Sequence, residues 1–425
     1  MATHSDPPAE SFKLSKLVND TRYRSYTFQI IALIGIFLFF GFLISNLLSN
    51  LADQGLQISY RFLGEAAGYD INQRLLDYNS QSTHMRAAVI GVINTLLIAV
   101  LGCFMATIIG VTVGVLRLSK NWLVRQLMSV YVEIFRNVPV LVWILIIMAV
   151  FTAAMPHPRD FLGDDATQSL LLFGTVAATR QGVWVSEPVF SRSLGDIDIL
   201  GGTSLYMGIS LDLMAILAVL VLSYLAARWF NRRADAIQRD TGVRPATLWP
   251  LLAIWIVPFV LLMLALGFHL SGPNITESRL RPIEGGMWLR NSFISLWFAL
   301  SIYTAAFIAE NVRAGILAVS KGQTEAAASL GLRPRRIMNL VILPQALRVI
   351  VPPLISQYLN LTKNSSLAIA VGYMDITATL GGITLNQTGR AIETILLLML
   401  FYLTISLSIS ALMNVYNNSI KLKER

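Results

Sequence analysis

The sequence predicts an all-α integral membrane protein with about eight transmembrane helices and with both termini in the cytoplasm. Three observations lead to this prediction. Of the 425 residues, 55% are hydrophobic and only 13% are charged, and the mean hydropathy is +0.62. Apolar runs long enough to cross a bilayer alternate with polar segments. Most Lys and Arg residues fall in every second polar segment, and the positive-inside rule places those segments in the cytoplasm.

The formal net charge of +9 does not indicate a nucleic-acid partner, because the cations lie between apolar runs, where they orient a protein in the lipid bilayer. Cys103 is the only cysteine, so no intrachain disulfide framework is expected.

Residues 1–27 form a polar, cation-containing tail that we expect in the cytoplasm, followed by a first, uncleaved transmembrane helix over 28–48. An external polar segment, 50–85, comes next. The second span, 89–116, carries the small residues Gly91, Gly102, Gly110 and Gly114, which suit close helix packing in lipid. The third span, 138–155, starts beside Pro139, which we expect in the first helical turn.

Residues 156–208 are the longest hydrophilic interval and carry more acidic than basic residues, so we expect an external loop. The fourth span, 211–230, leads into a cytoplasmic segment that is rich in arginine and ends at Arg244, and the fifth span, 248–270, returns outward.

The sixth span, 293–309, ends in Glu310 and Arg313, which are one helical turn apart and are expected to pair. The seventh, 346–371, contains Pro352 and Pro353, which predict a kink or an unwound stretch. The eighth, 391–415, leaves a basic cytoplasmic end with Lys421, Lys423 and Arg425.

Residues 321–345, KGQTEAAASLGLRPRRIMNLVILPQ, are the longest patterned polar stretch in this apolar chain. Their helix formers, Gly331 and Pro334 predict two short helices joined by a bend, with Pro344 where the chain returns to the membrane. The stretch resembles the EAA loop of ATP-binding-cassette (ABC) importer permeases, with Val341 in place of the consensus isoleucine. The matching residues are Glu325, Ala326, Ala327, Gly331, Leu343 and Pro344.

This resemblance extends over about 89–155 and 286–416 and includes the string YVEIFRNVPVLV, which is similar to the amino-acid branch of these permeases. It implies a type I permease domain over 89–416, whose five-helix core is made by the second, third, sixth, seventh and eighth spans. An external loop and a helix pair are inserted at about 156–290, as in the enlarged permeases of general L-amino-acid and glutamate, glutamine, aspartate and asparagine importers.

The resemblance further implies the function and the partners. The chain is expected to be a multi-pass permease in a bacterial inner membrane that translocates L-amino acids, with polar or acidic ones, or a broad range, favoured. The implied partners are a cytoplasmic ABC ATPase dimer, a second permease and a periplasmic amino-acid-binding protein. The favoured pair of permeases is a heterodimer, and a homodimer is the alternative that the sequence leaves open. Other small polar solutes are the alternative substrates.

No catalytic, cofactor or metal site is expected. The dipeptide Gly-Lys of a phosphate-binding loop does not occur, so ATP hydrolysis must take place on a separate subunit and the chain is not itself an enzyme. The four histidines lack helical pairing, and no Gly-x-Ser-x-Gly elbow is present. A secondary transporter or channel is the alternative class, but it would need intramembrane acids, of which the spans have few.

A polar cluster late in the seventh span is the candidate substrate pathway, because polar groups at such depth tend to face a cavity. Its members are Asn360, Thr362, Lys363, Asn364, Ser365 and Ser366. Lys363 is either a partner for a substrate carboxylate or a cation that reaches the outer headgroups. Glu325 likewise has two readings, a partner for a cation on the ATPase or a cap of its own helix. The sequence identifies neither the preferred amino acid nor the role of the insertion.

Overall fold

The structure is a computed structural model that describes residues 21–420 except 56, 163–168, 200–206, 244 and 279–281. The expected cytoplasmic positions 1–20, Arg244, Lys421, Lys423 and Arg425 lie outside the described residues. Within the described part of the chain, eight helices are long and apolar enough to cross a membrane, which confirms the predicted number. The chain divides into two units, Met1–Tyr60 and Arg61–Arg425.

The first unit contains α2 (Thr21–Asp53), which includes the predicted first span. Its apolar side chains from Phe28 to Leu48 are exposed on all sides of the helix. A helix that is apolar all round and buries none of this surface within its own unit is suited to contact with lipid.

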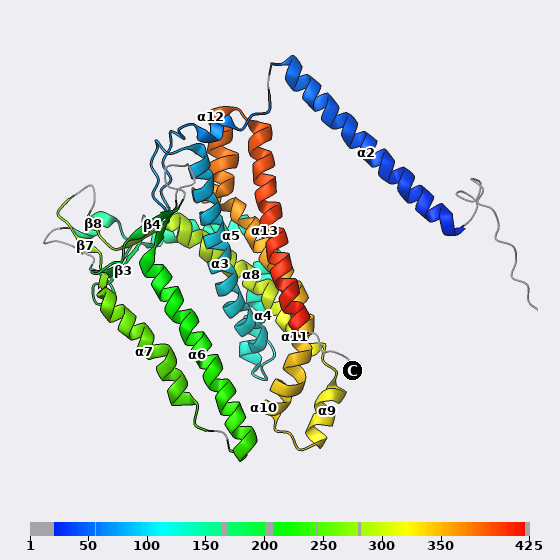
Figure 1. The fold of residues 1–425 in the computed structure, drawn as a ribbon, viewed down its shortest axis with the longest axis vertical. Coiled ribbons are helices and arrows are strands. Elements are labelled where there is room, and N and C mark those ends of the chain that lie inside the picture. Colours follow the sequence, from blue (N-terminus) through cyan, green and yellow to red (C-terminus); the bar gives the residue numbers. More distant parts are fainter. Residues whose placement is uncertain are drawn as a thin grey trace, which may run out of the picture. The chain divides into compact units, whose positions relative to one another are not determined.

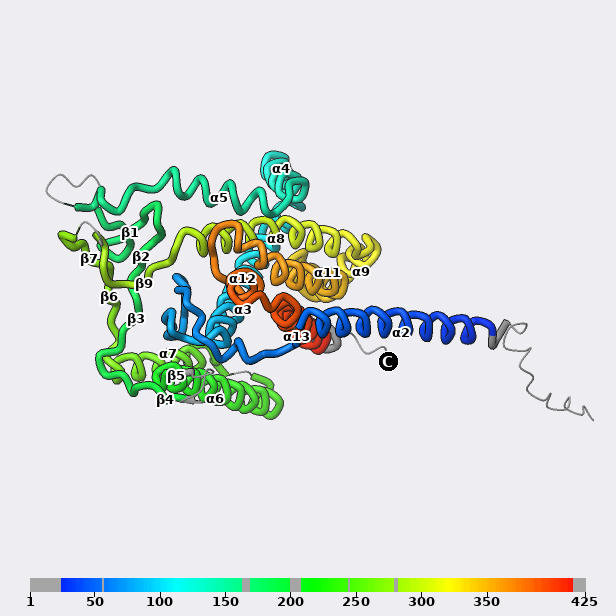
Figure 2. The backbone as a smooth tube through the Cα atoms, turned by 90° about the horizontal axis from the view of Figure 1, so that it is seen from above, coloured from blue at the N-terminus to red at the C-terminus, as the bar shows by residue number. Residues whose placement is uncertain are grey.

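The second unit is built around α8 (Asn291–Leu317), the span with the largest buried share in this unit. Among the other membrane-spanning helices of this unit, three pack directly against it, and a fourth packs against one of them, α11 (Figures 1 and 2). In chain order, these helices are α3 (His84–Leu116), α5 (Val140–Ala154), α11 (Leu343–Asn364) and α13 (Ala391–Ile420). The largest hydrophobic core cluster forms between α3, α5, α8 and α11.

Close contact between α3 and α8 depends on small residues. A Cβ atom added at Gly110 would lie 2.6 Å from Cβ of Ile308 and 2.9 Å from the carbonyl oxygen of Ala305. One added at Gly114 would lie 2.7 Å from the carbonyl oxygen of Ala309. Backbones can approach this closely only where a side chain is missing, and dispersion contacts then replace the hydrophobic effect that lipid does not provide.

The long inserted helices α6 (Leu211–Thr241) and α7 (Leu248–Leu266) form a pair of their own. Their main contacts are with each other and with the short strands at their ends (Figure 2). Both helices end at a left-handed glycine, Gly242 and Gly267, where the missing Cβ makes that conformation inexpensive.

Short antiparallel strands lie in the two connections that flank this pair, between α5 and α6 and between α7 and α8. A three-stranded sheet has the order β1-β2-β9, and three two-stranded sheets pair β3 with β6, β4 with β5 and β7 with β8. Their bounds are β1 (Val176–Thr179), β2 (Gly182–Val185), β3 (Glu187–Phe190), β4 (Asp196–Ile199), β5 (Met207–Ser210), β6 (Phe268–Ser271), β7 (Asn274–Ile275), β8 (Ile283–Glu284) and β9 (Met287–Arg290). The sequence predicted only a loop here, since strands of two to four residues are too short to show a recognisable alternation.

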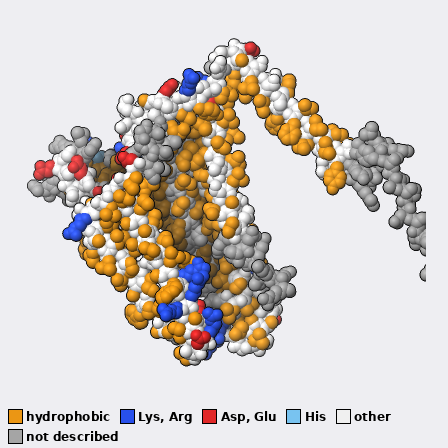
Figure 3. Space-filling view, viewed as in Figure 1, with side chains coloured by type: hydrophobic (Ala, Val, Ile, Leu, Met, Phe, Trp, Pro, Cys, Tyr) orange, Lys and Arg blue, Asp and Glu red, His pale blue; other side chains and the backbone are white. Residues whose placement is uncertain are grey.

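These strands mark one end of the second unit, here called the sheet end. The opposite end carries α9 (Lys321–Ser329) and α10 (Pro334–Ile337) and is called the α9 end (Figure 1). Hydrophobic side chains cover the helices between the two ends, and Lys and Arg side chains gather toward the α9 end (Figure 3). An apolar belt between polar ends is the surface that a membrane protein presents.

Two details differ from the sequence-based expectation. A separate amphipathic helix, α4 (Trp122–Asn137), precedes α5, so Pro139 stands at the N-cap of α5 and not in its first turn. Of the two outcomes expected at Pro352 and Pro353, the unwound stretch is absent, because α11 continues through both residues, and the kink stays a prediction. The packing of α11 on α8, α13 and α3 compensates for the lost backbone bonds, and the irregular turns lie before and after it, at the π-helical η3 (Met338–Ile342) and the 3₁₀-helical η4 (Ser365–Val371).

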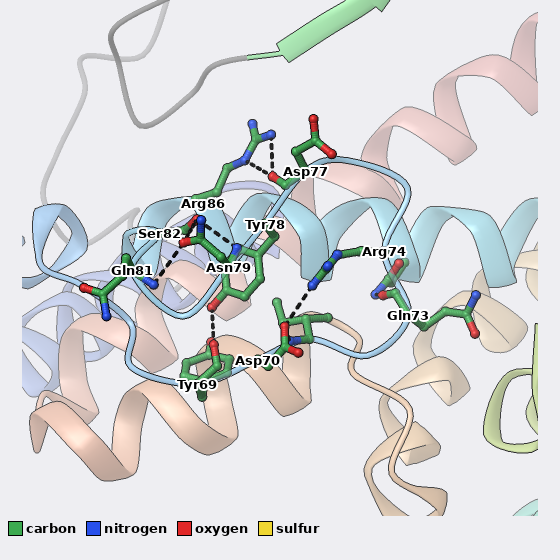
Figure 4. Close-up of polar contacts among 12 residues, drawn as sticks. Tyr69, Asp70, Gln73, Arg74, Asp77, Tyr78, Asn79, Gln81, Ser82 and Arg86 are labelled. Carbon is green, nitrogen blue, oxygen red and sulfur yellow. Dashed lines mark hydrogen bonds and ion pairs between the residues drawn. The ribbon is translucent and has the colours of Figure 1, made fainter. Parts of the chain in front are cut away.

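The loop between η1 (Arg61–Gly64) and α3 is held at the sheet end by polar contacts (Figure 4). Arg86 donates to the carbonyl oxygen of Asp77 at 2.9 Å, and the hydroxyl of Tyr78 donates to the carbonyl oxygen of Tyr69 at 2.9 Å. Asn94 of α3 donates to the carbonyl oxygens of Gln73 at 2.8 Å and of Met374 at 2.9 Å. The same side chain therefore fixes this loop and the segment after η4.

The remaining short elements are η2 (Pro158–Phe161), the π-helical η5 (Thr377–Thr384) and α12 (Leu385–Thr388). The last two connect η4 to α13, and η5 packs on α3.

Substituting Gly110 by Leu tests the α3–α8 contact. We expect the free energy of unfolding to fall by about 1–3 kcal/mol, because the added side chain would force the two helices apart. The matched control is Gly35→Leu, since Gly35 of α2 has no atom within 4 Å of an added Cβ. The thermal midpoint in detergent is measured by monitoring the loss of the monodisperse gel-filtration peak on heating. Equal midpoints for the two variants would contradict a tight α3–α8 contact.

Candidate functional site

The α9–α10 hairpin, residues 321–337, has the two helices and the bend that the sequence predicted. The helix α9 ends at Ser329, and Gly331 follows with φ +74°, with its backbone N–H donating to the carbonyl oxygen of Ala328 at 2.9 Å. The helix α10 then begins at Pro334. A residue with a side chain would pay about 1 kcal/mol or more for this left-handed conformation, so Gly331 sets the angle between the helices.

The hairpin presents an exposed surface of mixed character. Ala327 is buried, whereas Glu325 and Ala326 are exposed, and Leu330 is 80% exposed. An exposed leucine beside small side chains forms a flat apolar surface that another protein can contact. Leu343 and Pro344 lie beyond the hairpin, in the first turn of α11.

The prediction that Glu325 caps its own helix is wrong. The N-cap of α9 is Ser320, and Glu325 lies past the first turn. Within the part of the chain that the structure describes, its carboxylate has no hydrogen bond or ion pair. The other reading, a contact with a cation on another protein, is untested and stays a prediction.

The hairpin is a direct connection between two core helices. It follows α8 after a few residues and continues through η3 into α11. Since α8 and α11 pack on each other, a displacement of the hairpin acts on both at the α9 end.

Near this end, Glu310 has more partners than the sequence indicated. The predicted pair with Arg313 is present at 3.2 Å, but the same carboxylate also binds Arg117 of α3 and lies 3.8 Å from Arg136 of α4. The side chain of Arg117 is only 9% exposed and also donates to Ser129 at 3.4 Å. This single carboxylate therefore holds three helices together. Sequence spacing could show only the local pair, because Arg117 and Arg136 are distant along the chain.

The predicted substrate-pathway residues lie at the end of α11 and the start of η4. Three of the six direct their hydroxyl groups to their own helix: Thr362 to the carbonyl oxygen of Tyr358, Ser365 to that of Thr362 and Ser366 to that of Lys363, each at 2.8 Å. Hydroxyl groups that are satisfied in this way are poor candidates for substrate contact.

The other three, Asn360, Lys363 and Asn364, recur at helical spacing and therefore share one face of α11. Asn360 and Lys363 are exposed, and Asn364 is half-buried. None of the three side chains has a polar partner among the described residues. They form the part of the cluster that is available to a ligand or to another subunit.

One buried acid, Asp375, was not predicted from the sequence. Asp375 is fully buried between η4 and η5, accepts from the backbone N–H of Ala378 at 2.9 Å and lies 3.4 Å from the hydroxyl of Tyr402. The first contact is a local helix cap, and the second connects this segment to α13. Among the described residues, no group of three or more His, Cys, Asp or Glu side chains is placed to hold a metal ion.

A family model described as "binding-protein-dependent transport system inner membrane component" matches residues 220–422. The glutamate/glutamine/aspartate/asparagine transport system permease protein BztB of Rhodobacter capsulatus is 53% identical, and the match covers 100% of both chains. The general L-amino acid transport system permease protein AapQ of Rhizobium johnstonii is 39% identical over 96% of this chain and 94% of its own.

Among solved structures, a crystal structure of an amino acid ABC transporter with histidines aligns with 79% of this chain and 95% of its own. The sequence identity is 18% and the TM-score is 0.42.

Replacing Glu310 by Gln tests the three-helix junction. We expect a loss of up to about 3 kcal/mol of stability, because the largely buried Arg117 would keep its charge without a counterion. Glu133→Gln is the matched control, since Glu133 is exposed and bonds only Asn137, its own helix neighbour, at 3.3 Å.

The sharper measurement is a double-mutant cycle of thermal midpoints with Arg117→Gln. We expect the double variant to lose less than the sum of the two single losses. Strict additivity would show that the two side chains do not depend on each other.

Proposed function

This chain belongs to the family of binding-protein-dependent transport system inner membrane components, and from that premise we propose that it translocates L-amino acids in an ABC importer. The substrate class rests on the names of the full-length relatives, one for glutamate, glutamine, aspartate and asparagine and one for general L-amino acids. Polar or acidic amino acids are therefore the first substrates to test. The membrane is a bacterial inner membrane, with the α9 end and both termini in the cytoplasm.

The transport core in this proposal consists of α3, α5, α8, α11 and α13. The packing of α3, α5 and α11 on α8, and of α13 on α11, supports that division. The additions are α2 and the insertion at about 156–290, which contains α6, α7 and all nine strands that are found in the described residues. Since α6 and α7 contact mainly each other and adjacent strands, they extend the core without interrupting it.

The observation that carries the mechanism is the position of the α9–α10 hairpin at the ends of α8 and α11. A separate ATPase dimer binds the hairpin, and closure of the dimer on ATP displaces it. Because the hairpin is continuous with two packed core helices, this displacement rotates them together and switches the pathway between its two sides.

A second permease subunit, in a heterodimer, completes the pathway, and a periplasmic binding protein delivers the amino acid at the sheet end. The polar face of Asn360, Lys363 and Asn364 supports the first point, because an exposed polar face within a membrane span needs a cavity or another subunit beside it. In this assembly Lys363 offers a positive charge to a substrate carboxylate.

Gly331→Asp tests the hairpin. We expect a loss of about 5–30-fold in binding-protein-stimulated ATPase activity and uptake, because one or two kcal/mol of backbone strain would misdirect α10 against the ATPase. The matched control is Gly322→Asp in α9, where φ is ordinary and an added Cβ has open space. The assay uses the complete transporter in proteoliposomes, after the amount of inserted protein has been equalised.

Unchanged activity in Gly331→Asp would show that the hairpin is not the coupling element. Co-purification separates the classes: a permease retains an ATPase and stimulates it, whereas a secondary transporter or channel would transport amino acids alone.

Lys363→Met tests the pathway. We expect uptake of glutamate to fall about tenfold or more, because a charge-assisted hydrogen bond of roughly 1.5–3 kcal/mol would be lost. Lys120→Met serves as the control, since Lys120 is an exposed lysine near the α9 end, far along the chain from the polar face. Unchanged uptake and unchanged preference among amino acids would instead identify Lys363 as a headgroup contact.

A further inference from the structure

A cavity of about 500 Å³ lies at the sheet end, where the strands meet the core helices. Five separate parts of the chain contribute to it: the loop before α3, α5, the β1–β2 turn, the start of α8 and the end of η4. The lining residues are Asn72, Met148, Arg180, Gln181, Trp288, Arg290, Asn291, Ser292, Val371 and Gly372. A volume of this size is typical of small-molecule sites.

The lining carries positive charge without an acid to balance it. Arg180 and Arg290 are among the lining residues, and no Asp or Glu is. Burial lowers the pKa of the Arg290 guanidinium, and the nearby Asp70, which itself pairs with Arg74 at 2.8 Å, partly opposes this effect. An arginine stays charged in such surroundings, so this cation is partly desolvated and has no hydrogen-bonded counterion among the described residues.

Arg290 is also held in place. Its guanidinium lies 4.6 Å from the ring centroid of Trp288, which in turn stacks on Trp184 at 5.0 Å. Its backbone N–H donates to the side chain of Gln73 at 3.3 Å. A fixed guanidinium loses little conformational entropy when it binds a carboxylate.

The positive end of the α8 dipole lies at the same cavity. Arg290 is the N-cap residue and makes no side-chain cap, and Asn291 and Ser292 are the first residues of this 27-residue helix. Helix N-termini favour anions.

The buried Asn291 side chain links the start of α8 to the β1–β2 turn. Asn291 is 3% exposed, and its Nδ2 donates to the carbonyl oxygen of Arg180, which fixes the orientation of the amide. This hydrogen bond holds the backbone of Arg180 against the start of α8, so that Arg180 and Arg290 line the same cavity.

We propose that this cavity is an entry site for acidic amino acids, in which Arg290 and Arg180 bind the carboxylate groups. The inference rests on the proposed function and assigns a role to the insertion, because Arg180, Gln181, Trp288 and Arg290 belong to it. Val371 and Gly372 line the cavity at the end of η4, which starts at the polar cluster of α11. The short helix η4 therefore connects the entry site to the proposed pathway along the chain.

Cysteine protection tests the site directly. The chain has one cysteine, so the Cys103→Ser, Asn72→Cys variant carries a single thiol in the lining. The complete transporter, in right-side-out vesicles without binding protein, is labelled with a membrane-impermeant maleimide. We expect L-glutamate to slow the labelling and L-glutamine, which lacks the second carboxylate, to slow it much less.

Adding Arg290→Gln should raise the L-glutamate concentration for half-protection about tenfold or more, the loss expected for one charged hydrogen bond. Arg192→Gln, an exposed arginine of the insertion that does not line the cavity, is the matched control and should leave protection unchanged.

The proposal would be overturned by three results: no labelling from outside, equal protection by glutamate with and without Arg290→Gln, or protection only by the purified binding protein. The last result would make the cavity a receptor contact. Failure of the proposed function is a different outcome, because it would abolish ATPase stimulation and uptake in the unmodified transporter, whereas the labelling rates do not depend on either.

Discussion

The close approach of α3 to α8 is the constraint on which the rest of the structure depends. In lipid, two apolar helices gain little from hiding their side chains from water, so only tight packing holds them together. Gly110 and Gly114 allow that packing, with no room for a Cβ. The Glu310 junction then fixes the same two helices at the α9 end, and the buried amide of Asn94 ties α3 to the loop and to the segment after η4 at the other. The core is thereby held together along its length.

Much of this fold could be predicted from the sequence, because membrane spans are recorded in long apolar runs and in the distribution of Lys and Arg. The eight spans and the bend at Gly331 follow from such local signals. The amphipathic α4 was missed because its polar positions made it look like a connecting segment. The strands were missed because they are too short to show a recognisable alternation, and because pairs such as Gly182 with Arg290 join residues far apart in the sequence.

The candidate sites show the same limit. A motif with fixed spacing identified the hairpin, and an unusual run of polar residues identified the α11 cluster. Within that cluster, only coordinates separate the hydroxyl groups that bond their own helix from Asn360, Lys363 and Asn364. The arginine partners of Glu310 and the lining of the cavity come from several helices and loops, so their composition depends on the tertiary fold alone.

The ladder between β2 and β9 has a consequence for how such permeases can change in size. Gly182 and Arg290 are partners in register, so the polypeptide leaves and re-enters the core at neighbouring points, about 5 Å apart as paired strand residues are. The residues between them form one insertion whose two ends are held side by side. Its length can vary without altering the separation of α5 and α8, since the cost of closing a longer loop grows only slowly. Evolution could therefore add or remove the helix pair while the translocating machinery beneath it kept its geometry.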